Sequence, residues 1–315
     1  MKYILFIIIS FNLISDEGDI VERKTLDLDS YNQNINSFCK PKPSPEHSVW
    51  LEDFLKPSLS VLEWNYSITN GFYEGRKYIS GWGNGELQYY TKPKKNSNTN
   101  TTENLFIENG FLKIQPIKKN HKGFQYTSAR INTKGLREFT HPSEITICFK
   151  VPKGIGFWPA FWLMPADDIK WPQGGEIDIL ENRGRITNIS SSALHFGERY
   201  GKKSTLVGEV LIPRYANFQD KFHSITLRWQ KDKLSFFIDS HSEPYFQIDK
   251  NHPEFKKYLY PFNRNYYLII NVAVGGKYDD YLVDTEAFCE DSRCSNKEVP
   301  EDHQFIIDWI GYTKL

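Results

Sequence analysis

The sequence predicts an all-β fold, a sandwich or barrel built from many short strands. From residue 49 onward, short runs of aromatic and β-branched residues recur between turn residues, and several of these runs alternate in polarity. Stretches with helical periodicity are scarce. The clearest predicted strands are residues 87–91, 111–117, 145–151, 177–180, 224–229, 234–238 and 266–274.

Composition restricts the class of partner. The 315 residues include 39 Lys and Arg against 39 Asp and Glu, so the formal net charge is zero. Nucleic acid and anionic membranes select for basic surfaces, so neither is expected as the main partner. Aromatic residues make up 15 % of the chain, including 8 Trp. Most of them belong in strands and the core, but this density also suits a groove that stacks against flat sugar faces.

The N-terminus is typical of a signal peptide over residues 1–15. Lys2 precedes an apolar run over residues 3–14, and the small Ser15 offers a cleavage point before two acidic residues. A membrane anchor is the less favoured alternative, because a bilayer span needs about 20 apolar residues. We therefore expect a secreted protein, extracellular or in a cell wall, without membrane attachment after cleavage.

The rest of the chain predicts one large domain. Residues 16–45 are polar and end in the proline-rich stretch 41–45, so we expect a tail or linker before a folded domain over 46–315. Residues 94–104 are polar and of low complexity, which indicates a mobile surface loop. We find no internal repeat, and we expect a monomer.

Four cysteines in a secreted chain predict two disulfides. Cys289 and Cys294 are close in sequence and flank a polar stretch, so they are the first choice for one pair, which leaves Cys39 with Cys148. Three connectivities are open for four cysteines, and the sequence does not choose among them. Sequons begin at residues 65, 100 and 188, which mildly favours a secreted glycoprotein.

The segment 174–182, GGEIDILEN, carries the most chemical information. On a strand, side chains alternate between faces, so Glu176 and Asp178 share one face and the isoleucines at 177 and 179 share the other. Glu181 has the wrong parity and would enter the core, where an unpaired carboxylate is costly. A β-bulge at residues 179–180 would return Glu181 to the acidic face.

Two carboxylates about 5–5.5 Å apart on one face are what a retaining glycosidase needs. One carboxylate attacks the anomeric carbon, and the other protonates the leaving oxygen and then activates water. A third acid between them, Asp178, can raise their pKa values by repulsion or share a proton with Glu176. The alternatives are a solvated strand face, which would mix acids with cations or hydroxyls, and a calcium site, for which no EF-hand loop is present.

These residues resemble the catalytic strand of glycoside hydrolase family 16, and specifically of its laminarinase-like endo-β-1,3-glucanases. The bulged pattern Glu-x-Asp-x-x-Glu is typical of that group, whereas relatives active on mixed-linkage glucan and xyloglucan carry Glu-x-Asp-x-Glu. The resemblance runs from residue 49 to the C-terminus, through the stretches 82–90, 127–131, 158–162, 171–172, 194–197, 271–276 and 307–310. It implies a curved β-jelly-roll sandwich, concanavalin A-like, with a concave sugar-binding cleft.

The resemblance also implies a role for each matching residue. Glu176 would be the nucleophile, Glu181 the acid/base and Asp178 the supporting carboxylate. Five further residues would contact substrate: Asn84 and Arg130 through sugar hydroxyls, Trp158 and Trp162 by stacking, and His195 near the leaving group. Each has a structural alternative, namely a core tryptophan, a structural ion pair or a buried imidazole.

No cofactor is expected for catalysis, but a structural Ca²⁺ fits the resemblance. Asp308 matches one calcium-binding acid of the family. The segment 50–54 departs from the family's usual pattern, so the other calcium contact cannot be assigned to a residue. The insert 284–300, with its two cysteines, matches no pattern that we can assign.

The predicted partner is a β-glucan polysaccharide. A glucan-recognition protein without catalysis and a wall-remodelling transglycosylase are the competing functions on this fold.

Overall fold

The computed structural model describes residues 13–14, 20–26, 31–32, 34–93 and 104–315. Its largest element is a nine-stranded sheet in the order β1-β2-β17-β16-β15-β14-β21-β12-β4. The strands of this sheet are β1 (Leu13–Ile14), β2 (Ile20–Thr25), β17 (Lys202–Leu211), β16 (Ile189–Arg199), β15 (Glu176–Glu181), β14 (Phe157–Pro165), β21 (Tyr266–Val274), β12 (Arg130–Asn132) and β4 (Asn65–Tyr66).

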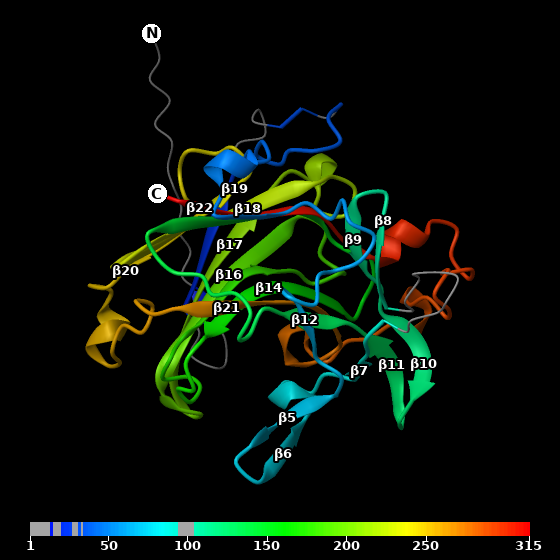
Figure 1. Cartoon of the computed structure of the whole chain (residues 1–315), viewed down its shortest axis with the longest axis horizontal. Helices are drawn as coiled ribbons and strands as arrows, with labels where there is room; N and C mark the ends of the chain where they lie inside the picture. Colours follow the sequence, from blue (N-terminus) through cyan, green and yellow to red (C-terminus); the bar gives the residue numbers. More distant parts are fainter. Residues whose placement is uncertain (1–12, 15–19, 27–30, 33, 94–103) are drawn as a thin grey trace.

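A second large sheet has the order β20-β19-β18-β13-β22-β9-β8, and β3 also pairs with β22 (Figure 1). Its strands are β20 (Phe246–Asp249), β19 (Lys233–Ile238), β18 (His223–Gln230), β13 (Ser143–Lys150), β22 (Phe305–Lys314), β9 (Phe111–Ile114), β8 (Leu105–Glu108) and β3 (Trp50–Glu52). Long connections between strands far apart in the chain give the jelly-roll topology. The predicted all-β sandwich is confirmed.

Two smaller sheets extend from the body. One contains β10 (Ile117–His121), β11 (Phe124–Ser128) and β7 (Gln88–Tyr90), and the other is the hairpin of β5 (Gly71–Glu74) and β6 (Lys77–Ser80), which projects from the body in Figure 1. Helical structure in the described residues consists of short 3₁₀ turns: Pro45–His47, Gly81–Gly83, Arg214–Ala216, Pro253–Lys256, Lys277–Asp279, Thr285–Ala287 and Pro300–His303. No helix there is long and apolar enough to span a membrane.

The core lies between the two large sheets, and alternating side chains fill it. On β21, Leu268, Ile270 and Val272 are fully buried in the core, while the intervening Asn271 lies on the opposite face. The predicted strands are confirmed as strands, with one exception: residues 111–117 divide between β9, which ends at Ile114, and β10, which begins at Ile117 in a different sheet. For residues 266–274 the bounds agree as well. This alternation gives the nine-stranded sheet one face toward the core and one face free for a site.

The N-terminal segment differs from its prediction. Residues 16–45 were expected to precede the domain as a tail, but β2 pairs in parallel with β17 over six register positions. Further on, the Phe38 N–H donates to the Phe222 carbonyl at 2.7 Å. The tail prediction is therefore wrong for β2 and for Phe38, because backbone pairing to a sheet edge needs no apolar pattern that a sequence would reveal. The signal peptide falls outside the described residues except for β1, and the loop 94–104 falls outside them except for residue 104.

Both expected disulfides form. Cys39 bonds to Cys148 in β13, and Cys289 bonds to Cys294 within the 284–300 insert. The first bond joins the N-terminal segment to the middle of the second large sheet, and the second joins two cysteines five positions apart in the chain.

Candidate active site

A β-bulge in β15 brings the three acids onto one face. Against β14, Asp178 is opposite Trp162 while Leu180 is opposite Phe161, so Ile179 is the extra residue. The pairing with β16 shifts at the same place, between residues 178 and 181. Ile179 and Leu180 are both fully buried, and the bulge returns Glu181 to the face of Glu176 and Asp178. The predicted bulge is confirmed, and we call this side of the nine-stranded sheet the acid-bearing face.

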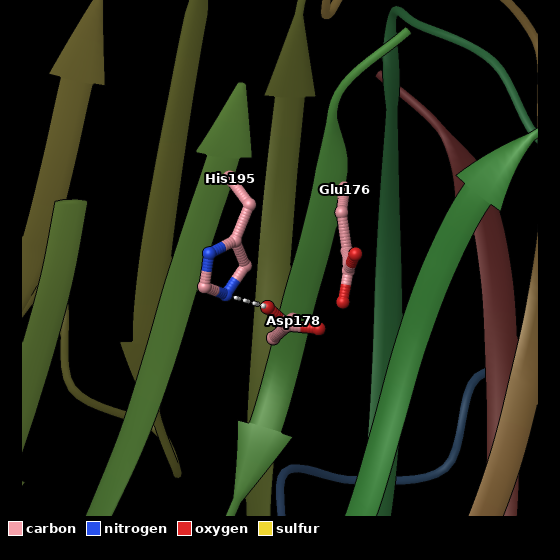
Figure 2. Close-up of side chains that lie close together, drawn as sticks. All are labelled: Glu176, Asp178 and His195. Atoms are coloured by element: carbon pink, nitrogen blue, oxygen red, sulfur yellow. Dashed lines mark ion pairs between the residues drawn. The ribbon is translucent and has the colours of Figure 1, made fainter. Parts of the chain in front are cut away.

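Glu176, Asp178 and His195 form one cluster, in which His195 comes from the neighbouring strand β16 (Figure 2). His195 Nε2 lies 3.2 Å from Asp178 Oδ2, a contact within ion-pair distance but without hydrogen-bond alignment. The other ring nitrogen, Nδ1, lies 3.0 Å from the Thr205 hydroxyl on β17. On the other side of the cluster, the Trp171 indole N–H donates to Glu176 Oε2 at 2.5 Å.

Glu181 has an indole partner of its own. The Trp158 Nε1–H donates to Glu181 Oε1 at 2.9 Å. The Trp158 ring stacks on Tyr278, with centroids 4.9 Å apart and an interplanar angle of 18°. Arg183 covers Tyr278 at 4.1 Å from its centroid and donates from Nε to the Tyr278 carbonyl. This stack fixes the indole and, through it, the carboxyl group of Glu181.

The environment favours the protonated acids. Burial, the largest cause, and the negative charge of Asp178 together raise the pKa of Glu176 to about 7, while His195 and the Trp171 N–H oppose the rise. Burial likewise raises the pKa of Glu181, and the Asp178 charge adds to this, while His195 and the Trp158 N–H act against it. Burial also raises the pKa of Asp178. The three groups lie close together and titrate as a unit.

Arg130 lies between two tryptophans on the acid-bearing face. Its guanidinium is 3.8 Å from the Trp82 ring centroid and 4.7 Å from that of Trp162. The Trp162 indole N–H donates to Asn271 Oδ1 at 2.8 Å. Trp162 and Arg130 are therefore fixed by protein contacts, which leaves for a sugar only those parts of them that these contacts do not cover.

A buried carboxylate supports this part of the site. Glu86 accepts hydrogen bonds from the side chains of Asn84, Gln88 and Tyr90. Burial raises the pKa of Glu86, and the nearby charge of Arg130 opposes that rise. Asn84 itself is exposed on the turn, and its carbonyl accepts from the Lys277 N–H at 2.8 Å.

The structure thus places every predicted catalytic residue in one cluster and arranges the predicted substrate contacts around it. Sequence reasoning missed three further site residues: Trp171, Tyr278 and Arg183. The signals for them were weak, since Trp171 belongs to a matching Trp-Pro pair and Tyr278 follows the Gly-Gly of the stretch 271–276. Their roles depend on loop conformations that no local pattern encodes.

The expected calcium ligands do not gather into a carboxylate cage. Glu52 accepts from the Trp64 indole N–H and the Phe54 backbone N–H. Burial raises the pKa of Asp308, and the Lys42 cation opposes this. In the described part of the chain, the one cluster of three metal-ligand side chains is Glu176, Asp178 and His195. These three side chains alone do not fit a Ca²⁺ site, and the structural Ca²⁺ that the resemblance suggests stays a prediction.

A curved β-sandwich whose open face carries two glutamates of raised pKa, with tryptophans and an arginine beside them, is the arrangement of a glycoside hydrolase. Comparison with known proteins agrees. The profile of glycosyl hydrolases family 16 matches residues 82–287. The laminarinase catalytic domain of Thermotoga maritima superposes with a TM-score of 0.70 at 30 % identity, covering 85 % of this chain and 98 % of that chain.

Relatives also match at the level of sequence. Beta-glucanase from Rhodothermus marinus is 30 % identical over 250 residues, covering 76 % of this chain and 80 % of that protein. Glucan endo-1,3-beta-glucosidase A1 from Niallia circulans is 29 % identical over 269 residues, covering 80 % of this chain but 37 % of that much longer protein. The chain belongs to glycosyl hydrolase family 16, and the resemblance inferred from its motifs is confirmed.

Proposed function

We propose that this protein is a retaining endo-β-1,3-glucanase that uses Glu176 as nucleophile and Glu181 as acid/base. The observation that carries the proposal is the bulge at residue 179, which puts both glutamates on one face, each with one carboxyl oxygen bonded to an indole N–H. The preference for β-1,3-glucan is drawn from the relatives, whose names include a glucan endo-1,3-beta-glucosidase and a laminarinase.

In the first step, Glu176 attacks the anomeric carbon and the glycosidic bond breaks. Because Trp171 occupies Oε2, the attacking oxygen is Oε1. The proton on Glu181 passes to the leaving oxygen, and Oε2 carries that proton because Trp158 occupies Oε1. The products are a glycosyl ester on Glu176 and a carboxylate on Glu181, so charge and protons balance.

In the second step, the Glu181 carboxylate takes a proton from water. The resulting nucleophile attacks the anomeric carbon, and the ester bond to Glu176 breaks. Two inversions at the same carbon retain the β configuration. The enzyme returns to its starting state, with Glu176 ionised and Glu181 protonated.

Asp178 sets this division of protons. Its negative charge adds to burial in raising the pKa of both glutamates, which favours keeping a proton on the acid/base near neutral pH. His195 and the Trp171 N–H favour an ionised Glu176. When Glu176 becomes an ester, one negative charge leaves the cluster, which lowers the pKa of Glu181 as it begins to act as a base.

The proposed setting is extracellular. The predicted leader and the two disulfides fit an oxidising compartment, where a polysaccharide substrate is also accessible. Glucan recognition without catalysis is less well supported, because both glutamates are present and anchored. A transglycosylase would use the same two steps with a sugar hydroxyl in place of water.

The direct test is reducing-sugar release from linear β-1,3-glucan by the parent, Glu176→Gln and Glu181→Gln. We expect release by the parent and a loss of at least about 1,000-fold in Glu176→Gln. Glu243→Gln, at an exposed position between β19 and β20, serves as the matched control and should keep parental activity. Glucan binding without release from any variant would show a recognition protein instead.

A further inference from the structure

Strand β2 extends the acid-bearing face beyond the segment that the family profile matches, which begins at residue 82. In register, Glu181 is opposite Ser191 on β16, Ser191 is opposite Glu209 on β17, and Glu209 is opposite Arg23 on β2. This row crosses about 14 Å of sheet from the acid/base to the edge, given the usual spacing between strands. Figure 1 shows the dark-blue N-terminal strand alongside β17.

Burial separates the two faces of these strands. Leu206 and Val210 of β17 are buried in the core, and Ile20, opposite Leu206, packs against that core. The alternate positions therefore face the other way, with the catalytic acids. On β2 these positions include Val21 and Arg23, whereas Lys24 lies on the core side and donates to the Pro244 carbonyl at 3.0 Å.

Arg23 forms a polar site with Glu209. Its Nε and Nη2 donate to Glu209 Oε2 at 2.7 and 2.5 Å, and the Arg23 side chain is 37 % exposed. A guanidinium has five N–H donors, and a carboxylate accepts several hydrogen bonds, so the pair can also bind hydroxyl groups. Glu209 Oε1 lies 3.9 Å from Arg183, which covers Tyr278 beside the acid/base. The polar row is thus continuous with the catalytic site.

A small apolar row runs beside the polar one. Asp178 is opposite Ala193, Ala193 is opposite Val207, and Val207 is opposite Val21. A neutral β-linked sugar has an apolar ring face and a rim of equatorial hydroxyls. Val207 and Val21 are partly exposed and suit the first, whereas Ala193 is buried; the polar row suits the second.

We propose that β17 and β2 form a distal subsite for glucan, in which Arg23 and Glu209 hydrogen-bond sugar hydroxyls over the apolar row ending at Val21. It lies on the side of β15 where His195 lies, which the resemblance makes the leaving-group side. This inference rests on the proposed function, and it assigns a substrate-binding role to a segment outside the matched family region. Cleavage after Ser15 would retain β2 in the mature protein.

The test compares Arg23→Ala with Lys24→Ala, its neighbour on the opposite face. Affinity for β-1,3-gluco-oligosaccharides of increasing length is measured by calorimetry in a Glu176→Gln background, and kcat/KM for the same series is measured with Glu176 intact. We expect Arg23→Ala to weaken binding of long oligosaccharides about three- to tenfold and to leave the shortest ones unchanged. Arg23→Lys keeps the positive charge but loses the paired N–H donors of the guanidinium, so its affinity for long oligosaccharides should lie between those of the parent and Arg23→Ala. Lys24→Ala should match the parent.

A loss that is equal at all lengths, no loss at any length, or the same loss in Lys24→Ala would overturn the inference. The proposed function fails separately, if the parent releases no sugar from β-1,3-glucan. Binding in the Glu176→Gln background does not need turnover, so it decides the subsite in either case. Melting temperatures within a degree or two of the parent exclude a folding defect.

Discussion

Replacing Trp171 with phenylalanine removes one hydrogen bond from Glu176, the proposed nucleophile, and keeps an aromatic ring at this position. The bond runs from Nε1 to Glu176 Oε2 at 2.5 Å. Hydrogen bonds to charged groups contribute about 1.5–3 kcal/mol. A loss of that size in the transition state lowers kcat/KM by about 10- to 150-fold. The ring contacts with Tyr200 and Lys203 remain available to phenylalanine.

The same substitution changes the pH profile in one direction. The indole N–H favours ionised Glu176, so its removal raises a pKa that is already about 7. Glu176 must be ionised to attack, so the acidic limb of kcat/KM moves to higher pH. We expect a shift of about one unit, with the greatest loss of activity at low pH. The assay is kcat/KM on a β-1,3-gluco-oligosaccharide from pH 4 to pH 9.

An unchanged acidic limb together with kcat/KM within twofold of the parent would refute the role of Trp171. A uniform loss at every pH, with the limb in place, would assign the indole to substrate binding instead. Thermal unfolding of the variant serves as the control for folding.

Three further predictions concern other parts of the molecule. Trp158→Phe removes the N–H that lowers the pKa of Glu181, so Glu181 should stay protonated to a higher pH. The basic limb of kcat/KM should therefore move to higher pH, and an unmoved limb would contradict this. Glu176→Gln should stabilise the fold above pH 7 by up to about 3 kcal/mol. The folded-state pKa of Glu176 is raised from 4.5 to about 7, so its ionisation costs stability across that range, and melting temperatures of parent and variant should converge at pH 4. Cys148→Ser removes a disulfide between residues 109 positions apart and should lower the free energy of unfolding by about 4–5 kcal/mol. Cys294→Ser removes one between residues 5 positions apart and should lower it by about 2 kcal/mol. Equal melting temperatures of the two variants would refute the loop-length argument.

The bulge in β15 illustrates how far sequence reasoning reaches. Regular strand alternation would point Glu181 into the core. Burying an unpaired carboxylate there is costly, so the sequence predicts one extra residue, a β-bulge, that returns Glu181 to the face of the other two acids. This inference needed only strand geometry and electrostatics, both of which act over a few residues. The alternation within β21 could be predicted for the same reason.

The hydrogen-bond partners of the acids could not be predicted in this way. Trp171 reaches Glu176 from a turn, and Tyr278 reaches Trp158 from a short 3₁₀ helix after β21. Both contacts depend on how loops settle against the sheet, which is a tertiary property. Strand β2 was missed for a related reason, because its charged residues find partners only in the folded protein. Arg23 pairs with Glu209 on one face, and Lys24 donates to the Pro244 carbonyl on the other.

The division of roles between the two glutamates is the central claim, and chemical rescue by azide tests it most directly. The substrate is an aryl β-glycoside of a β-1,3-gluco-oligosaccharide, whose leaving group needs no proton. With Glu176→Ala, azide replaces the nucleophile and we predict an α-glycosyl azide; with Glu181→Ala, azide attacks the ester on Glu176 and we predict a β-glycosyl azide. The reverse pair of products, read by proton NMR, would contradict the assignment.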